Sequence, residues 1–540
     1  MRKRTLEIGW GMLHLEEIAK DTNSGPGIKL QKGDTVMIFS PNSLAYPVML
    51  HGAFAAGLRV TLANTAYTPG ELKHQYTDSG ASAIFVHADM LPIVLQMLQL
   101  CGVEGADARR RIIIAEWPGT GTAANRLPGY LALRSLLSGK ALPHEVRFDG
   151  PAANETALLC YSSGTTGRAK GVMTTHRNLT SLCCIISPLF TPTDASPNPE
   201  TGLTKDVMLG VLPFYHIYGA VKLLHWPYTT GLPVVIMPRF DIVKFVSLIE
   251  RWRCTISLIV PPILLALVHH PVVDKYDISS LRIMFSGAAP LGAPLANAVR
   301  QRLMKANGGK EVVITQGYGL TETSPTSHLL QDKEALRKVG SIGQLLPNLE
   351  ARLVNDDGED AEEGERGELW TRGPTVMKGY INNPEATADA ITPDGWFKTG
   401  DVCIRDSEGF YTIVDRKKEL IKYKGFQVPP AELESTLLQH PEIVDAAVIG
   451  VNSVKEATEL PRAYVVPANK ALLEPSASQE REAFGRAVQK WIEGRVAKHK
   501  YLRGGVVVID VVPKSAAGKI LRRELRERAK KELSEVKAKL

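Results

Sequence analysis

The chain has 540 residues, of which 44% are hydrophobic and 22% are charged, and its net charge is +7. This length is too great for one ordinary core and the composition is that of a globular protein, so we expect two or more domains. The basic residues of 514–539 alternate with glutamates, which favours a solvated helix over a nucleic-acid-binding patch. The six scattered cysteines form no CxxC pair and no apolar run could span a bilayer, so we expect neither a zinc site nor a transmembrane segment.

The first part of the chain alternates helical periods with short β-rich runs, after an opening helix expected over Leu6–Ala19. Strands are expected at Thr35–Phe39, Arg59–Leu62 and Ala83–Val86, and helices at Pro47–Ala56, Glu71–Ser79 and Leu91–Leu100. This alternation predicts a largely parallel sheet with helices on its faces. The segments Pro118–Pro128 and Pro192–Thr204 are rich in turn-forming residues and predict loops.

A second series of strands ends each time in an unusual group of residues. The strands are expected at Val207–Leu212, Val234–Met237, Thr255–Val260, Arg282–Phe285 and Val312–Thr315. The groups that follow them are PFYH, PRF, PPI, SGAAP and QGYG. Ligands of open α/β sheets bind beyond the carboxyl ends of the strands, so we expect these groups to converge on one crevice.

The region Leu349–Glu408 is richer in Asp, Glu and Gly and has short strands such as Glu368–Thr371. A Ser407-Glu408-Gly409 turn predicts a hairpin between strands Val402–Arg405 and Phe410–Val414. A smaller unit follows, so we place a domain boundary at Lys418, giving domains 1–417 and 418–540.

The smaller unit combines helices with strands. Its expected elements are a helix from Ala431, a strand at Ala446–Gly450, an amphipathic helix with Phe484, Val488, Trp491 and Val496 on one face, a strand at Val506–Val512 and a charged C-terminal helix.

The stretch Tyr161–Val172, YSSGTTGRAKGV, has the residue types of a loop that holds a polyphosphate. Glycines let backbone N–H groups approach a ligand, hydroxyls donate hydrogen bonds and a lysine supplies charge. The spacing is not that of a P-loop, because Ala169 precedes Lys170 and Gly171 follows it. Taken alone, such a glycine-rich run favours a polar surface turn.

Six further motifs follow in order: PFYHIYG at 213–219, SGAAPLG at 286–292, QGYGLTE at 316–322, TGD at 399–401, DRKKELIKYKGFQVPPAELE at 415–434 and PKSAAGKILRREL at 513–525. With the glycine-rich stretch, they make residues from about 33 to 525 resemble the AMP-forming adenylating enzymes, which include acyl-CoA synthetases, peptide-synthetase adenylation domains and luciferases. The resemblance is greatest to the 4-coumarate–CoA ligase-like branch.

The resemblance implies an α/β fold. A large N-terminal domain of mostly parallel sheets flanked by helices, with a small β-barrel-like closing subdomain, precedes a small mobile α+β domain. Relatives usually carry several dozen residues upstream, including strands of the first subdomain, so the start of this sequence is expected to be either a true short form or a misplaced start. The implied reaction joins a carboxylic acid to ATP, giving an acyl-adenylate and pyrophosphate, and the thiol of coenzyme A then displaces AMP. ATP, Mg²⁺ and coenzyme A are therefore expected, and catalysis consists of positioning and charge stabilisation.

The resemblance assigns the nucleotide site motif by motif. The residues implied for the β- and γ-phosphates are Ser162, Ser163, Gly164, Thr165, Thr166 and Lys170. Those implied for the α-phosphate, with Mg²⁺ on Glu322, are Thr321 and Glu322. The adenine pocket is assigned to Ala288, Gln316, Gly317 and Tyr318, and the ribose to Asp401 and Arg416. For Arg416 the alternative is a hairpin salt bridge. Lys519 is implied as the catalytic lysine of the small domain that reaches the phosphoryl oxygens during adenylation.

The remaining assignments concern the acid and the thiol. His216, Tyr218, Gly317 and Leu329 are implied on the acyl side, with His216 beside the reacting carboxylate. Arg239, Lys422, Lys424 and Gly425 are implied for coenzyme A, Gln427 for AMP in the thioester-forming state, and Lys418 for the hinge. Lys222, one helical turn past Tyr218, could meet a second carboxylate or polar tail of the acid, or could extend to the surface. Aryl, aryl-alkanoic and medium-chain acids all remain open.

Alternative functions are a luciferase-like adenylating oxygenase, a carrier-protein-dependent adenylation domain and a non-catalytic binding protein. The complete set of charged motif residues argues against the last of these, and no carrier domain is visible in the chain. The terminal Ala538-Lys539-Leu540 resembles the SKL-type peroxisomal signal, which implies an import receptor as partner. Without import, the protein would be cytoplasmic.

Overall fold

The computed structural model describes residues 1–22, 27–117, 127–162, 169–189, 206–424, 426–453, 456, 458–515 and 518–538. The first sheet has seven strands in the order β5-β4-β3-β1-β2-β6-β7, parallel except for the β6–β7 pair. Its strands are β1 Thr35–Phe39, β2 Arg59–Leu62, β3 Ala81–Val86, β4 Ile112–Ile114, β5 Leu131–Ala132, β6 Thr156–Ser162 and β7 Lys170–Thr175. The helices of this part are α1 Arg2–Leu13, α2 Leu15–Asp21, α3 Ala45–Ala55, α4 Pro69–Ser79, α5 Leu91–Leu100, α6 Gly105–Arg109 and α7 His176–Ile186.

The second sheet also has seven strands, in the order β14-β13-β12-β11-β10-β8-β9. The strands from β8 to β12 pair in parallel, and β13 and β14 are antiparallel. They are β8 Met208–Gly210, β9 Val234–Ile236, β10 Ile256–Ile259, β11 Ile283–Ser286, β12 Val313–Gly319, β13 Thr326–Leu329 and β14 Gln344–Leu345. The helical segments are α8 Ile217–Gly219, the π-helix η6 Ala220–His225, α9 Trp226–Thr230, α10 Ile242–Trp252, α11 Pro261–His269 and α12 Ala293–Ala306.

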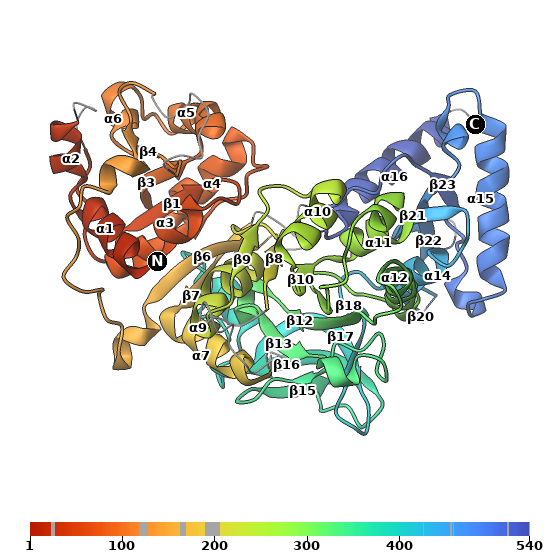
Figure 1. Ribbon diagram of the computed structural model, residues 1–540. Coiled ribbons are helices and arrows are strands. Elements are labelled where there is room, and N and C mark those ends of the chain that lie inside the picture. The colour runs from red at the N-terminus through yellow and green to blue at the C-terminus, as the bar shows by residue number, and fades with distance from the viewer. Residues whose placement is uncertain are drawn as a thin grey trace.

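Two smaller parts complete the chain. The closing subdomain is an antiparallel sheet of β15 Glu350–Val354, β16 Arg366–Arg372, β17 Phe397–Arg405 and β18 Tyr411–Arg416, with helix α13 Pro384–Ala390. The C-terminal unit has strands β19 Ile421–Tyr423, β20 Phe426–Val428, β21 Ile443–Ser453, β22 Thr458–Pro467 and β23 Val506–Val508, and helices α14 Pro430–Leu437, α15 Ser478–Glu493 and α16 Arg522–Ala538. Figure 1 shows the N-terminal part in red and orange on the left and the C-terminal unit in blue on the right.

Burial explains this division. One hydrophobic core runs from Ile8 on α1 through both seven-stranded sheets, whereas residues after 420 form cores of their own. The predicted parallel sheets, the 402–414 hairpin and the separate α+β unit are thereby confirmed. The expected 6–19 helix is wrong as one helix, because the chain breaks at His14. Val496 lies beyond α15, although it packs against the same core.

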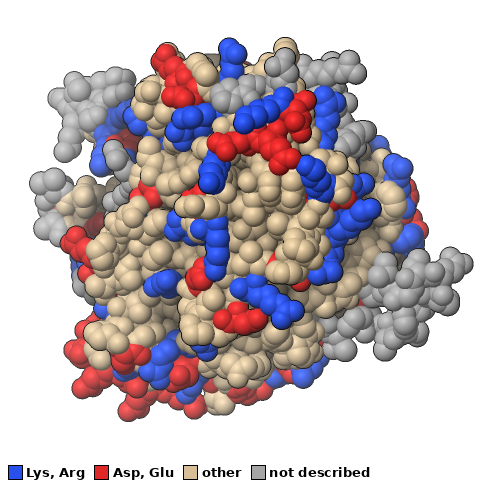
Figure 2. Space-filling view, turned by 90° about the vertical axis from the view of Figure 1, so that its left-hand side faces the viewer, with Lys and Arg blue, Asp and Glu red and all other residues tan. Residues whose placement is uncertain are grey.

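The surface carries mixed charge. Figure 2 shows the N-terminal side of the molecule, where Lys and Arg side chains lie among Asp and Glu around a largely uncharged centre. Within the described ranges, no helix has both the length and the apolar character needed to cross a bilayer. The absence of a nucleic-acid partner stays a prediction.

Candidate active site

Lys519 of the C-terminal unit lies near Glu322, Asp401 and Arg416, next to the carboxyl ends of β10 to β12, and this group of residues is called the crevice below. Gly518 packs closely on the end of β10, since a Cβ there would lie 3.1 Å from Pro262 Cδ. Burial, assisted by the charge of Arg416 and opposed by the charges of Glu419, Asp401 and Glu322, lowers the pKa of Lys519 to about 8. A lysine from the end of the chain therefore shares one site with residues of β17, β18 and the 316–322 motif.

Glu322 joins the phosphate-loop motif to the crevice. It is 7% exposed, and its Oε1 accepts hydrogen bonds from Ser162 Oγ at 3.0 Å and Tyr380 Oη at 2.9 Å. The ammonium of Lys170 lies over the ring of Tyr380, 4.3 Å from its centroid. The sequence analysis missed Tyr380, which stands far from Glu322 in the chain and outside every recognised motif. Ser163, Gly164, Thr165 and Thr166 lie outside the described residues.

Buried Tyr318 and Asp401 lie beside Glu322 together with the partly exposed Arg416. Asp401 Oδ2 accepts a hydrogen bond of 2.6 Å from Tyr318, and Asp401 Oδ1 lies 3.2 Å from Arg416 Nε. Asp401 and Arg416 are cross-strand partners in the β17–β18 hairpin. The salt bridge considered for Arg416 as the alternative to ribose binding is therefore present, and it lies in the crevice. Burial raises the pKa of Asp401, against the opposing effect of the Arg416 charge.

His216 and Tyr218 line the crevice where the chain turns from β8 into the helical segments. His216 Nδ1 accepts from the Tyr218 N–H at 3.3 Å, and Tyr218 Oη donates to the Phe285 carbonyl at 3.1 Å. Burial, assisted by the charge of Lys519, lowers the pKa of His216 to about 4. The imidazole is therefore neutral at pH 7 and acts as a hydrogen-bonding group.

Local backbone geometry and hydrogen bonds account for several other residues of the SGAAPLG and QGYGLTE motifs. A Cβ on Gly319 would lie 1.5 Å from the Pro325 carbonyl oxygen, so this position needs glycine. Ala288 has φ +67°, a conformation rare for a residue with a side chain and often found at binding sites. The amide of Gln316 exchanges two hydrogen bonds of 3.3 Å with the Leu291 backbone, so it holds the neighbouring loop in place. Thr321 begins a short 3-10 turn that carries Glu322.

The residues assigned to coenzyme A, to AMP in the thioester-forming state and to the hinge do not lie in this crevice. Lys422, Lys424 and Gln427 lie exposed on the β19–β20 hairpin, and Lys424 makes a 2.8 Å ion pair with Glu456 of the same unit. Arg239 is exposed just after β9. Lys418 is exposed in the turn between β18 and β19, and Gly425 lies outside the described residues.

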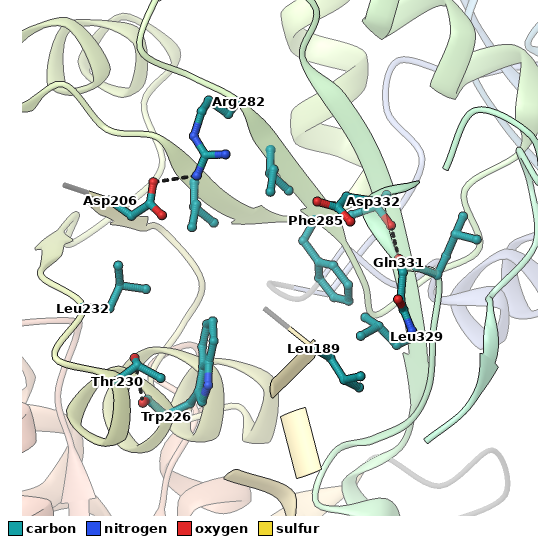
Figure 3. Close-up of a pocket in the computed structure, with 14 residues that line it drawn as sticks. Leu189, Asp206, Trp226, Thr230, Leu232, Arg282, Phe285, Leu329, Gln331 and Asp332 are labelled. Atoms are coloured by element: carbon teal, nitrogen blue, oxygen red, sulfur yellow. Dashed lines mark hydrogen bonds and ion pairs between the residues drawn. The ribbon is translucent and has the colours of Figure 1, made fainter. Parts of the chain in front are cut away.

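A cavity of about 60 Å³ lies next to the crevice, between the second sheet and α9. Figure 3 shows Phe285 and Leu329 of the sheet facing Trp226 of α9 across it, with the Arg282–Asp206 ion pair of 2.6 Å at another side. Leu329 is the β-ladder partner of Gly317, and a Cβ on Gly317 would lie 2.5 Å from the Phe285 ring. The predicted acyl residues Gly317 and Leu329 thus connect the crevice with the cavity. Sequence reasoning missed Phe285 and Trp226, which look like ordinary core residues.

Comparison with known proteins decides the family. The family model of the AMP-binding enzyme matches residues 27–381, and that of the AMP-binding enzyme C-terminal domain matches residues 432–519. The chain belongs to the AMP-binding enzyme family. Among curated relatives of this AMP-binding enzyme, a probable 4-coumarate–CoA ligase from Dictyostelium discoideum is 37% identical over 525 residues, covering 95% of the chain and 88% of the relative.

Solved structures agree with the family assignment. An o-succinylbenzoate–coenzyme A synthetase from Bacillus subtilis, solved with its acyl-adenylate intermediate, is 26% identical to this AMP-binding enzyme with a TM-score of 0.72, covering 97% of this chain and 91% of that one. The same synthetase in complex with ATP and a magnesium ion has a TM-score of 0.72 at 26% identity, covering 95% and 92% of the two chains.

Proposed function

We propose that this AMP-binding enzyme is an ATP-dependent carboxylate–CoA ligase that forms an acyl-adenylate and then an acyl-CoA thioester. The observation that carries this proposal is the position of Lys519, which reaches from the C-terminal unit into a crevice containing Glu322, Asp401 and Arg416. The CoA ligase names of the curated relatives and the acyl-adenylate bound by the solved synthetase support the same chemistry.

Adenylation needs positive charge at the α-phosphate while pyrophosphate leaves. Lys519 supplies it from the small unit and Lys170 from the phosphate loop, and neutral His216 orients the attacking carboxylate. The buried carboxylate of Asp401 would accept hydrogen bonds from the ribose hydroxyls, and its ion pair with Arg416 would fix its orientation. No covalent bond to the protein is needed, so the residues of the site contribute by positioning the reactants and stabilising charge.

Magnesium fits the residues of this site. The carboxylate of Glu322 is a hard oxygen ligand beside Ser162, and the described residues contain no cluster of three or more acidic, His or Cys side chains that could hold a metal. Mg²⁺ commonly binds through one or two carboxylates together with substrate phosphates and water. Glu322 would hold the ion, which when bound neutralises phosphate charge.

Thioester formation requires the phosphate-binding lysine to withdraw and a thiol to enter. We place the domain boundary and hinge at Lys418, so that rotation of residues 418–540 would replace Lys519 by the β19–β20 hairpin with Lys422, Lys424 and Gln427. The exposure of this hairpin supports the proposal, because its residues have no role in the crevice while Lys519 occupies it. Arg239 would contact coenzyme A on the large domain.

The acid is proposed to extend from His216 past Tyr218 toward the cavity of Figure 3. The mainly apolar walls, with Phe285, Trp226 and Leu329, suit an aryl, aryl-alkanoic or medium-chain acid.

The test is pyrophosphate release from ATP and Mg²⁺ across a panel of carboxylic acids, with and without coenzyme A. A ligase releases pyrophosphate only with suitable acids and converts them to CoA thioesters. Adenylation without thioester formation, accompanied by oxygen uptake or light, would instead indicate a luciferase-like oxygenase. No pyrophosphate release with any acid would refute the proposal.

Peroxisomal localisation is a second proposal, and the C-terminal Ala-Lys-Leu tripeptide supports it. A fluorescent protein fused to the N-terminus should enter peroxisomes with the full chain and stay cytosolic when Leu540 is deleted. Diffuse cytosolic fluorescence from the full-length fusion would contradict import.

A further inference from the structure

A lysine is buried in the helical segment that connects the crevice with the cavity. Lys222 is 2% exposed and ranks among the largest fully buried side chains of the described residues, so the alternative of a side chain extending to the surface is wrong. It lies in the π-helix η6, a geometry that is rare and often found at functional sites. Lysine is among the residues that are almost never fully buried unless they are paired.

The neighbours of Lys222 along the chain place it between the two halves of the acyl path. Tyr218, four residues earlier, bonds to the Phe285 carbonyl at the crevice end. Trp226, four residues later, faces the cavity. Lys222 therefore stands midway along the segment that runs from the crevice to the cavity, although it is not itself one of the residues that line the cavity.

The opposite wall comes from α7. Cys183 of this helix lies near Lys222, and the segment that follows the helix reaches Leu189, which lines the cavity. Burial lowers the pKa of Lys222 to about 7 and raises the pKa of the Cys183 thiol to about 11. Burial therefore favours the neutral amine of Lys222 and the neutral thiol of Cys183. An anion brought beside the amine would favour its protonated form.

We propose that Lys222 selects acids that carry a second carboxylate, which it binds along the path between crevice and cavity. This inference rests on the proposed ligase function and names the substrate class of the same site. A second carboxylate beside the buried amino group forms a charged hydrogen bond, whereas a monoacid of equal length makes no such contact.

The test compares acids matched in length, octanoate with suberate and 3-(4-methylphenyl)propanoate with 3-(4-carboxyphenyl)propanoate, by kcat/KM for thioester formation. Wild-type enzyme should prefer the diacid of at least one pair. Lys222→Met, of similar length without charge, should lower the diacid-to-monoacid ratio about 10- to 100-fold, the range expected for one charged hydrogen bond. Lys310→Met, which changes an exposed lysine, is the control and should leave the ratio unchanged.

Wild-type activity that favours the monoacid in both pairs would overturn the inference without Lys222→Met having to fold. A diacid preference that persists in Lys222→Met, with the melting temperature retained, would also overturn it, and Lys222→Gln provides a second neutral variant. Failure of the ligase proposal looks different, because the wild-type enzyme would then activate none of the acids.

Discussion

Replacement of Lys519 by alanine tests the division of labour between the two faces of the C-terminal unit. The side chain is the cation that the small unit brings to Glu322 and Asp401 in this arrangement. Removing one preorganised charge from a transition state costs about 10²- to 10³-fold in rate, or roughly 2.7–4 kcal/mol. Lys519→Ala should therefore lose adenylation by about 100-fold or more and still convert supplied acyl-adenylate and coenzyme A into thioester.

The pKa of Lys519 adds a dependence on pH. With a pKa of about 8, about ten molecules in eleven carry the charge at pH 7 and about one in eleven at pH 9. The charged form is the active one, so kcat/KM for adenylation should fall as the pH rises through about 8. The arginine of Lys519→Arg keeps its charge over this pH range. The fall of kcat/KM above about pH 8 should therefore disappear in this variant, even if its absolute rate is lower.

The assay is ATP–pyrophosphate exchange without coenzyme A for the first half-reaction, and thioester formation from purified acyl-adenylate for the second. Lys424→Ala should impair thioester formation more than adenylation, because Lys424 belongs to the β19–β20 face of the C-terminal unit. Equal loss of both half-reactions in Lys519→Ala, or an unchanged pH profile in Lys519→Arg, would refute the reasoning.

Three further substitutions address other contacts of the structure. Tyr380→Phe removes the hydroxyl that donates to Glu322 and should slow pyrophosphate exchange about 10-fold at an unchanged melting temperature; an unchanged rate would show that this hydrogen bond is dispensable. Arg522→Met leaves the buried Glu434 carboxylate without its 2.7 Å ion pair and should destabilise the C-terminal unit by about 3–5 kcal/mol in chemical denaturation, with a loss below about 1 kcal/mol counting against the prediction. Lys418→Pro fixes φ at the hinge and should impair thioester formation more than adenylation when each half-reaction is assayed alone; equal impairment would place the hinge elsewhere.

Local sequence patterns were sufficient for most elements of the fold. The predicted strands 35–39 and 59–62 and the helix 91–100 coincide with β1, β2 and α5, because each is a short apolar run or amphipathic period bounded by turn residues. The opening helix failed because nothing in its periodicity signalled the break at His14. The antiparallel return of β7 was also unexpected, since its glycine-rich start resembles a loop rather than a strand.

Charged motif residues were easier to predict than the contacts that hold them. Glu322, Asp401 and Lys519 stand in recognisable motifs, and the structure brings them into one crevice. Tyr380 donates a hydrogen bond to Glu322 in the crevice, and the ring of Phe285 lies beside Gly317 next to the cavity. Neither residue was assigned a role from a motif, so their roles are visible only in the tertiary contacts.

The sequence by itself determined the family, the order of α/β elements and the residue types available for adenylate chemistry, because these depend on motif spacing and local periodicity. The tertiary structure decided which of two lysine-bearing faces meets the nucleotide site, placing Lys519 in the crevice and Lys424 at the surface. It also decided that Lys222 is buried. Both outcomes depend on how distant segments pack, and a side chain's burial is a property of those contacts rather than of its position in the chain.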